Sequence, residues 1–265
     1  DPLPGTWAGA NIGSTGTFGS ECYTSATGTY SAQGAGSLTT ATTDGFRFVY
    51  ATLTGNGSIT AKVNSLTATN NHKAGVMIRE SLANNARSAS SLIVRSSSAW
   101  RCQFLRRTST GGTASSTQPN TTTTPPYWVR ITRSGNTFTS HRSSNGTTWT
   151  QVGSATVAMG NTTYIGLALA SGSTTSAATA SISNVSTTGP VSFFASNDRD
   201  ESASELDIFV DENAAKPNLE VYPNPGTDRI NVKLQVVKPA RVQLELVDML
   251  GHTVFQMPVQ EAPQG

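Results

Sequence analysis

The amino-acid sequence predicts an all-β protein built as an antiparallel β-sandwich with a second, smaller β domain at its C-terminal end. Three observations support this fold class. Apolar and polar residues alternate along many short segments, as in strands with one wet and one dry face. Glycine and asparagine separate these segments at hairpin spacing. Charged residues make up only 13% of the chain, and serine, threonine, glycine and asparagine replace them, which suits the uncharged polar outer face of a sandwich.

The pattern is clearest in residues 127–153, which predict three antiparallel strands joined by two tight turns. Gly135 with Asn136, and Asn145 with Gly146, supply the turns because these residue types tolerate a positive φ. The apolar residues of the three strands are Tyr127, Val129, Ile131, Phe138, Trp149 and Val152.

The remainder of the first 188 residues follows the same pattern. Alternation predicts strands near residues 46–51, 59–64, 99–107, 164–169 and 178–185. Two continuous apolar runs, at 76–78 and 92–94, predict strands that are covered on both faces. Residues 108–126 are almost wholly threonine, serine, glycine, proline and asparagine, and they predict an exposed loop. The residues expected in the core are Val76, Ile78, Val129, Ile131, Phe138, Trp149 and Leu167.

The distribution of charge divides the chain into parts. Residues 1–196 contain twelve lysines and arginines against four acids, whereas residues 197–218 contain two against seven, and the remainder contains four against five. We therefore predict a sandwich over residues 1–188, an acidic linker over 189–218 and a small β domain over 219–265. Alternating residues after Ile230 and after Val242 predict two strands of that last domain.

The two cysteines, Cys22 and Cys102, lie too far apart in sequence for a metal site. They form either a disulfide or a pair of inert core thiols, and an exporting compartment permits the disulfide. No run of about 18 apolar residues is present, so we expect no membrane-spanning helix.

Four segments occur in a characteristic order: AGVMIRES at 74–81, YWVRI at 127–131, SNGTTW at 144–149 and YIGL at 164–167. This order resembles the concanavalin A-like jelly-roll modules that are appended to bacterial glycosidases and surface proteins. The resemblance covers about residues 5–187 and implies a jelly-roll sandwich. It specifies function less closely, because one fold hosts many functions and such modules often have no demonstrated ligand.

The C-terminal domain carries a YPNP box at 222–225, an alternating strand that ends near Leu234 and a DMLG turn at 248–251. This arrangement resembles the C-terminal sorting domain of the type IX secretion system of Bacteroidota. The resemblance implies that secretion machinery at the outer membrane is a partner and that the protein, by way of the periplasm, becomes secreted or attached to the cell surface. Members usually continue past a glycine into one or two closing strands, so we expect the domain to be incomplete at Gly265. The motif residues are Tyr222, Pro223, Asn224, Pro225, Asp248, Leu250 and Gly251.

The ionisable residues favour a protein without catalytic activity. Glycoside hydrolysis requires two carboxylates about 5–10 Å apart across a cleft, and the acids of the sandwich form no such cluster in sequence; we expect Glu80 to pair with an arginine. The histidines are isolated and lie at no metal-ligand spacing. We therefore expect no enzyme and no cofactor. Calcium is the one cation that we consider, with Asp44, Asn70 and Asn71 as candidate ligands.

The candidate binding residues are Trp128, Arg130, Arg101 and Arg106. A tryptophan on the solvent face of a strand can stack on a sugar ring; the alternative is that Trp128 lies under a loop. Trp149 is expected in the core. A patch of basic side chains would attract acidic polysaccharide or lipopolysaccharide; the alternative is scattered solvated charge. The arginines considered are Arg95, Arg101, Arg106, Arg107, Arg130, Arg133 and Arg142.

These observations predict a non-catalytic, secreted or cell-surface module for glycan binding or adhesion. Nucleic acid is not an expected partner, because stacked aromatic side chains are missing from the pattern. Two alternatives stay open. One is a structural subunit of a surface layer, filament or adhesin, and the other is an accessory domain of a glycoside hydrolase whose catalytic part lies outside this chain.

Overall fold

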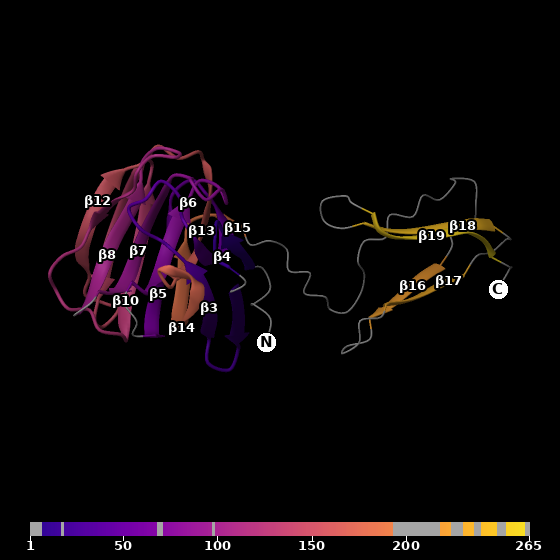
Figure 1. The fold of residues 1–265 in the computed structure, drawn as a ribbon, viewed down its shortest axis with the longest axis horizontal. Helices are drawn as coiled ribbons and strands as arrows, with labels where there is room; N and C mark the ends of the chain where they lie inside the picture. The colour runs from indigo at the N-terminus through magenta and orange to yellow at the C-terminus, as the bar shows by residue number, and fades with distance from the viewer. Residues whose placement is uncertain are drawn as a thin grey trace. The chain divides into compact units, whose positions relative to one another are not determined.

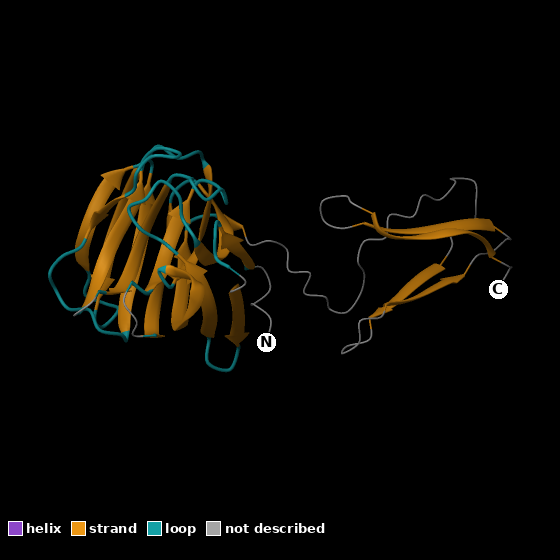
Figure 2. Cartoon of the chain, in the orientation of Figure 1, coloured by secondary structure: helices purple, strands orange, loops and turns teal. Residues whose placement is uncertain are grey.

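The computed structural model describes residues 7–16, 19–67, 71–96 and 99–192, together with strands at 218–223, 230–235, 240–247 and 253–262. Throughout this described part the regular elements are strands (Figure 2), as the sequence predicts. The chain divides into two compact units, Asp1–Ser196 and Asn197–Gly265, which we describe separately. In the described residues we find no helix with the length and apolar character to cross a membrane.

The first unit is a sandwich of two antiparallel sheets (Figure 1). Sheet A has the order β1 (Ala8–Ile12), β4 (Phe46–Thr54), β13 (Thr162–Ala170), β6 (Lys73–Arg79), β7 (Ser88–Arg95), β8 (Trp100–Arg107) and β9 (Ser115–Thr117), with β15 (Val191–Ser192) also paired to β4. Sheet B has the order β12 (Thr150–Thr156), β11 (Thr137–Ser143), β10 (Tyr127–Ser134), β5 (Gly57–Leu66), β14 (Ser173–Thr188), β3 (Thr29–Gly36) and β2 (Gly19–Thr24). The predicted all-β sandwich is confirmed. Its last described strand, β15, ends at Ser192, four residues beyond the predicted boundary at 188.

The core between the sheets is formed by the inward-facing residues of both sheets. Six of the seven predicted core residues are buried there: Val76, Ile78, Val129, Ile131, Phe138 and Leu167. Their burial follows from strand geometry, because every second side chain points to the same face. Trp149 is the exception: it is half-buried and lies outside this core.

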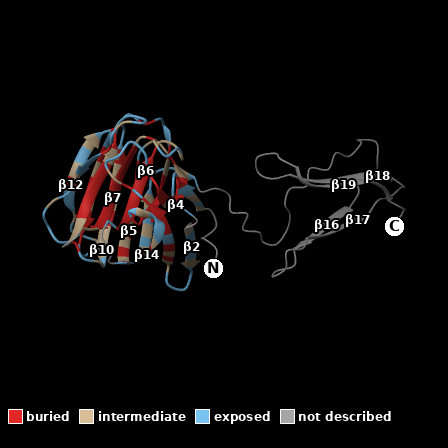
Figure 3. Ribbon diagram, viewed as in Figure 1, coloured by how far each residue is buried: buried red, intermediate tan, exposed pale blue. Residues whose placement is uncertain are grey.

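Sheet A has a second apolar layer on its outer face. Phe46, Phe48 and Met77 are buried there, and the segments that carry Leu38 and Leu82 cover them. Because both faces of sheet A are covered, all seven residues of β6 are buried, and Figure 3 shows the buried residues gathered on β6 and β7. This double burial explains the continuous apolar runs in the sequence.

Sheet B is buried on one face only. Its outer face carries half-exposed or exposed polar side chains, of which many are hydroxyl groups. Examples on neighbouring strands are Thr60, Lys62, Thr132, Thr139, Ser154 and Thr156. This asymmetry produces the clean alternation that residues 127–153 show in sequence.

The two cysteines are free and lie in different environments. Cys22 is exposed on β2, whereas Cys102 is buried on β8. Burial raises the pKa of Cys102 to about 12, so its thiol stays protonated and unreactive. The disulfide alternative is therefore wrong for this structure, and only Cys102 is a core thiol.

Lys73 is a lysine placed in the apolar layer outside sheet A. It is only 6% exposed, and its Nζ donates to the carbonyl oxygen of Leu38. Burial lowers its pKa from 10.5 to about 8. Between about pH 8 and 10.5 the unfolded chain therefore holds more protons at this group than the folded chain, so Lys73 destabilises the fold less as pH rises through this range.

We expect the wild-type chain to gain about 2 kcal/mol of stability relative to Lys73→Met when the pH is raised from 7 to 9.5. Urea unfolding followed by tryptophan fluorescence at both pH values would measure the difference. Lys62→Met, on the outer face of sheet B, is the matched control: it keeps Lys73, so its stability should change with pH as that of the wild type does. A pH response that is equal in wild type and Lys73→Met would contradict the buried charge.

The second unit contains two antiparallel pairs among its described residues. β16 (Asn218–Pro223) pairs with β17 (Ile230–Gln235), and β18 (Ala240–Val247) pairs with β19 (Thr253–Ala262). The two strands predicted from alternation are thus present, and Tyr222 and Pro223 of the sorting motif lie at the end of β16. The other motif residues lie outside the described residues, as does most of the predicted linker; they are Asn224, Pro225, Asp248, Leu250 and Gly251.

Candidate functional site

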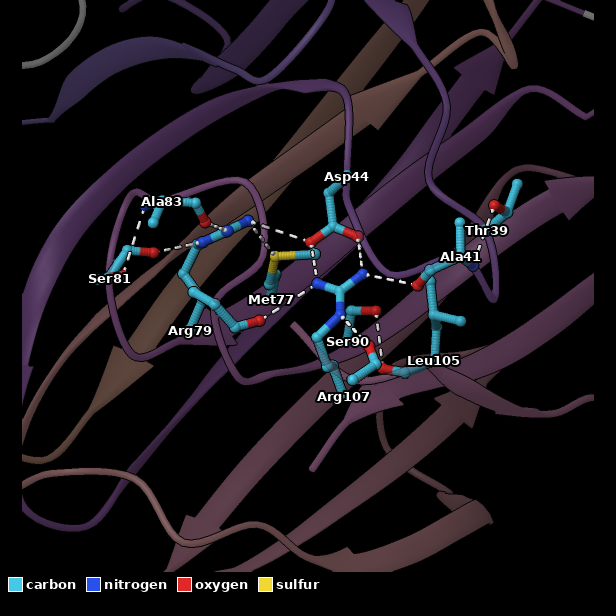
Figure 4. Close-up of polar contacts among 12 residues, drawn as sticks. Thr39, Ala41, Asp44, Met77, Arg79, Ser81, Ala83, Ser90, Leu105 and Arg107 are labelled. Atoms are coloured by element: carbon cyan, nitrogen blue, oxygen red, sulfur yellow. Dashed lines mark hydrogen bonds and ion pairs between the residues drawn. The ribbon is translucent and has the colours of Figure 1, made fainter. Parts of the chain in front are cut away.

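The carboxylate of Asp44 is the most strongly engaged acid of the sandwich. Arg107 donates two hydrogen bonds to this carboxylate, Nη1 to Oδ2 at 2.6 Å and Nη2 to Oδ1 at 2.7 Å. Nη1 of Arg79 lies 3.8 Å from the same Oδ2. The side chain of Asp44 is 2% exposed and those of both arginines are 0% exposed. Figure 4 shows these three residues, which we call the Asp44 cluster.

The Asp44 cluster also fixes loops over the outer face of sheet A. Arg107 donates to the carbonyl oxygens of Ala41, Ala86 and Gly112. Arg79 donates to the carbonyl oxygens of residues 81 and 83. Burial lowers the pKa of Arg79 to about 10, and Asp44 opposes this shift. One buried carboxylate thus holds two guanidinium groups that bind three separate loop segments.

The other two described acids of the sandwich are also paired with arginine. Glu21 accepts from Arg47 at 2.6 and 2.7 Å, where β2 faces β4 across the edge of the sandwich. Glu80 lies 3.3 Å from Arg87, so the expected arginine pair of Glu80 is confirmed. All three described carboxylates of the sandwich are thus paired with arginine.

The described residues contain no group of three or more histidine, cysteine, aspartate and glutamate side chains placed to hold a metal ion. Among the calcium candidates, both oxygens of Asp44 are engaged by Arg107. Asn71 adopts a left-handed backbone with a φ of 67°, and Asn70 lies outside the described residues.

The predicted arginine patch is wrong, because its members point to different faces. Arg107 belongs to the Asp44 cluster. Arg133 is buried and donates to the carbonyl oxygens of Gly135, Met159 and Gly160 at the end of the sandwich. Arg142 is buried as well.

Arg101 and Arg106, two of the candidate binding residues, project from opposite faces of β8, because their positions differ by an odd number. Arg101 donates to Asn120 and Thr122. Arg106 donates to Thr117 at 2.7 Å and lies over the ring of Phe104. These two arginines therefore hold the segment that follows β8, and they do not share a surface with Trp128 and Arg130.

Trp128 and Arg130 lie together on the outer face of sheet B. The guanidinium carbon of Arg130 is 4.1 Å from the ring centroid of Trp149, a shorter separation than the 5.0–5.7 Å of the other arginine–aromatic pairs described. Trp149 is half-buried on this outer face, so its predicted place in the core is wrong. The reason is register: Thr150 pairs with Arg142, and Trp149 precedes the paired part of β12.

Trp128 packs beneath the turn that joins β11 to β12. A Cβ atom at Gly146 would lie 2.8 Å from the Trp128 ring, and Gly146 has a φ of +77°, so only glycine fits. The Oδ1 atom of Asn145 accepts hydrogen bonds from the backbone of Thr147 and Thr148, at 3.0 and 2.9 Å. The turn is therefore locally fixed, and of the two alternatives for Trp128 the structure confirms the one under a loop.

Two polar atoms on this face have no hydrogen-bond partner among the described residues: Nε of Arg130 and Nδ1 of His141. The two residues are directly opposite each other on β10 and β11. Burial lowers the pKa of both, and the positive charge of Arg130 lowers that of His141 further. His141 is therefore neutral near pH 7.

We call this site the Arg130 surface and define it as Lys62, Trp128, Arg130, His141 and Trp149. Lys62 belongs to it because it pairs with Trp128 across β5 and β10. The sequence did not indicate three of these residues as parts of a site: Lys62, His141 and Trp149. The signal for His141 was present, because the two-residue hairpin at 135–136 fixes the register that places it opposite Arg130.

Comparison with family models gives a match in the C-terminal part of the chain. Residues 220–264 match the family described as "Secretion system C-terminal sorting domain". A type IX sorting domain engages the secretion machinery and marks the protein for export, so this protein is secreted or attached to the cell surface. A search of the curated proteins found no match.

Several solved structures resemble the sandwich. A functionally unknown protein from Saccharomyces cerevisiae has a TM-score of 0.57 and 16% identity, with coverage of 71% of this chain and 97% of its own. The carbohydrate-binding module CBM66 from Bacillus subtilis has a TM-score of 0.41 and 15% identity, with 69% and 96% covered. A mutant of the GH43 protein BlXynB from Bacillus licheniformis has a TM-score of 0.40 and 14% identity, with 52% and 32% covered. At 16% identity the likeness to the yeast protein shows the fold alone, and no argument is drawn from the two structures with TM-scores of 0.41 and 0.40.

Proposed function

We propose that this chain is a non-catalytic, exported β-sandwich module that binds glycans through the Arg130 surface. The observation that carries the proposal is the stack of Arg130 on Trp149, 4.1 Å apart, on a sheet face covered with hydroxyl groups. The match to the sorting domain supports the exported location. The resemblance of the sequence motifs to the sorting domains of Bacteroidota supports a bacterial source in that group.

The chemistry of the face suits a sugar. Rings of tryptophan and the plane of a guanidinium contact the C–H face of a pyranose, and the surrounding hydroxyl groups exchange hydrogen bonds with its hydroxyls. Trp149 directly follows a turn whose backbone is fixed by hydrogen bonds to Asn145, so little backbone entropy is lost there when a ligand binds. These are the requirements of recognition, and they involve no acid or base.

The state of the carboxylates supports a role without catalysis. Glu21, Asp44 and Glu80 each pair with arginine, so the described part of the sandwich offers no pair of free carboxylates for glycoside hydrolysis. A binding role of this kind also serves an accessory domain, if a glycoside hydrolase part lies outside this chain.

We expect the purified chain to bind polysaccharides on a glycan array and Trp149→Ala to weaken that binding by about tenfold, because an aromatic anchor at the centre of a contact contributes more than about 1 kcal/mol. Thr156→Ala, at the far end of β12, is the matched control and should bind as wild type does. An array without any bound glycan would overturn the proposal.

A further inference from the structure

We infer that the Arg130 surface selects glycans that contain uronic acid, with the sugar ring stacked on Trp149 and its carboxylate paired with Arg130. This inference rests on the proposed function and specifies its ligand. In the ligand-free chain, Arg130 occupies the ring face of Trp149, which is the face on which a pyranose would stack. Arg130 is therefore a side chain that a sugar must displace.

The resting position of Arg130 leaves one of its donors without a partner. Its Nε is buried and makes no hydrogen bond within the described residues, and a buried unpaired donor costs free energy. A cation–π contact between two half-buried side chains offsets only part of that cost. A rotation that lifts the guanidinium off the ring would release Nε to a ligand oxygen, so displacement recovers a hydrogen bond.

The released guanidinium suits a carboxylate in particular. The Nε and Nη donors of arginine form a planar fork that matches the two oxygens of a carboxylate. A uronic acid carries that group on the ring that would replace the guanidinium on Trp149. One sugar residue can therefore take both positions, the ring face and the cation.

The charge on the outer face of sheet B also favours an acidic ligand. Among the described residues of sheet B, no aspartate or glutamate projects from the outer face, because Glu21 of β2 points inward to Arg47. Within this described part of the molecule, Lys62 and Arg130 therefore have no acidic neighbour on that face. His141 lies opposite Arg130 and opposite Gln151 on its other side, and as a neutral group it adds no charge.

Titration of the full chain with oligogalacturonate tests the inference, with tryptophan fluorescence as the signal. Neutral galactan and dextran sulfate serve as comparison ligands. We expect oligogalacturonate to bind at least tenfold more tightly than galactan, and Arg130→Gln to remove that preference while galactan binding is kept or improved. Arg130→Lys should restore little of the preference for oligogalacturonate, because an ammonium group lacks the planar fork of donors. Arg101→Gln, on the other sheet, is the control that changes net charge equally.

The outcomes separate the inference from the function on which it rests. Equal binding of galactan and oligogalacturonate would overturn the inference and leave glycan binding intact. The same holds if Arg130→Gln retains the preference, or if dextran sulfate binds as tightly as oligogalacturonate and Arg101→Gln weakens both equally, which would indicate general ion exchange. Failure to bind any of the three ligands or any arrayed glycan would overturn the proposed function itself.

Discussion

Asp44→Asn is expected to lower the free energy of unfolding by about 3–5 kcal/mol, because it leaves the guanidinium groups of Arg79 and Arg107 buried without a counter-charge. Both arginine side chains are 0% exposed, so water cannot replace the lost carboxylate. The asparagine keeps the size of the side chain, and the loss therefore measures charge. Urea unfolding followed by tryptophan fluorescence gives the difference in free energy.

Glu80→Gln is the matched control for this prediction. It also removes one carboxylate that pairs with an arginine, but those side chains are 27% and 34% exposed. We expect a loss of at most about 1 kcal/mol, since solvent screens such a pair. If Asp44→Asn cost no more than Glu80→Gln, the Asp44 cluster would not hold the loops on sheet A as we describe.

Deletion of residues 219–265 is expected to abolish display of the protein outside the cell and to leave it in the periplasm. The deleted segment contains the whole match to the sorting domain, residues 220–264. The sandwich forms a compact unit without it, so the truncated chain should remain folded. Surface proteolysis and fractionation of the expressing cells would measure where the protein accumulates.

Trp149→Ala in the full-length chain is the control for export, because it alters the sandwich and leaves the tail intact. It should reach the surface at the normal yield. If the truncated chain reached the surface equally well, the tail would be only another structural domain and the assignment of its sorting role would be wrong.

The fold could be predicted because its signals are local. Val129 and Ile131 lie two residues apart and face one core, and a hairpin of two residues determines which strand comes next. Covered strands were predictable for the same reason, since β6 and β7 are apolar on both faces. No pairing between distant strands was needed to assign the class.

The site could be predicted only in part, because it depends on which strands become neighbours. Arg107 meets Asp44 across 63 positions of sequence, and no local pattern indicates that contact. The arginines predicted to form one patch lie on different faces. Arg101 and Arg106 project from opposite faces of β8, and Arg133 is buried. Trp128 and Arg130 are predictable as a pair because they share one strand. The face on which Trp149 lies is not predictable from alternation, because this residue precedes the paired part of β12.

The unequal covering of the two sheets also bears on how such a protein can change during evolution. Sheet A is packed on both faces and ties its loops through one buried acid, so most substitutions there carry a cost in stability. The described residues place no second layer on the outer face of sheet B, and its hydroxyl-bearing residues can be exchanged with little effect on folding. Ligand preference can therefore drift on sheet B while sheet A preserves the fold, and relatives of this module would keep one sheet and diversify the other.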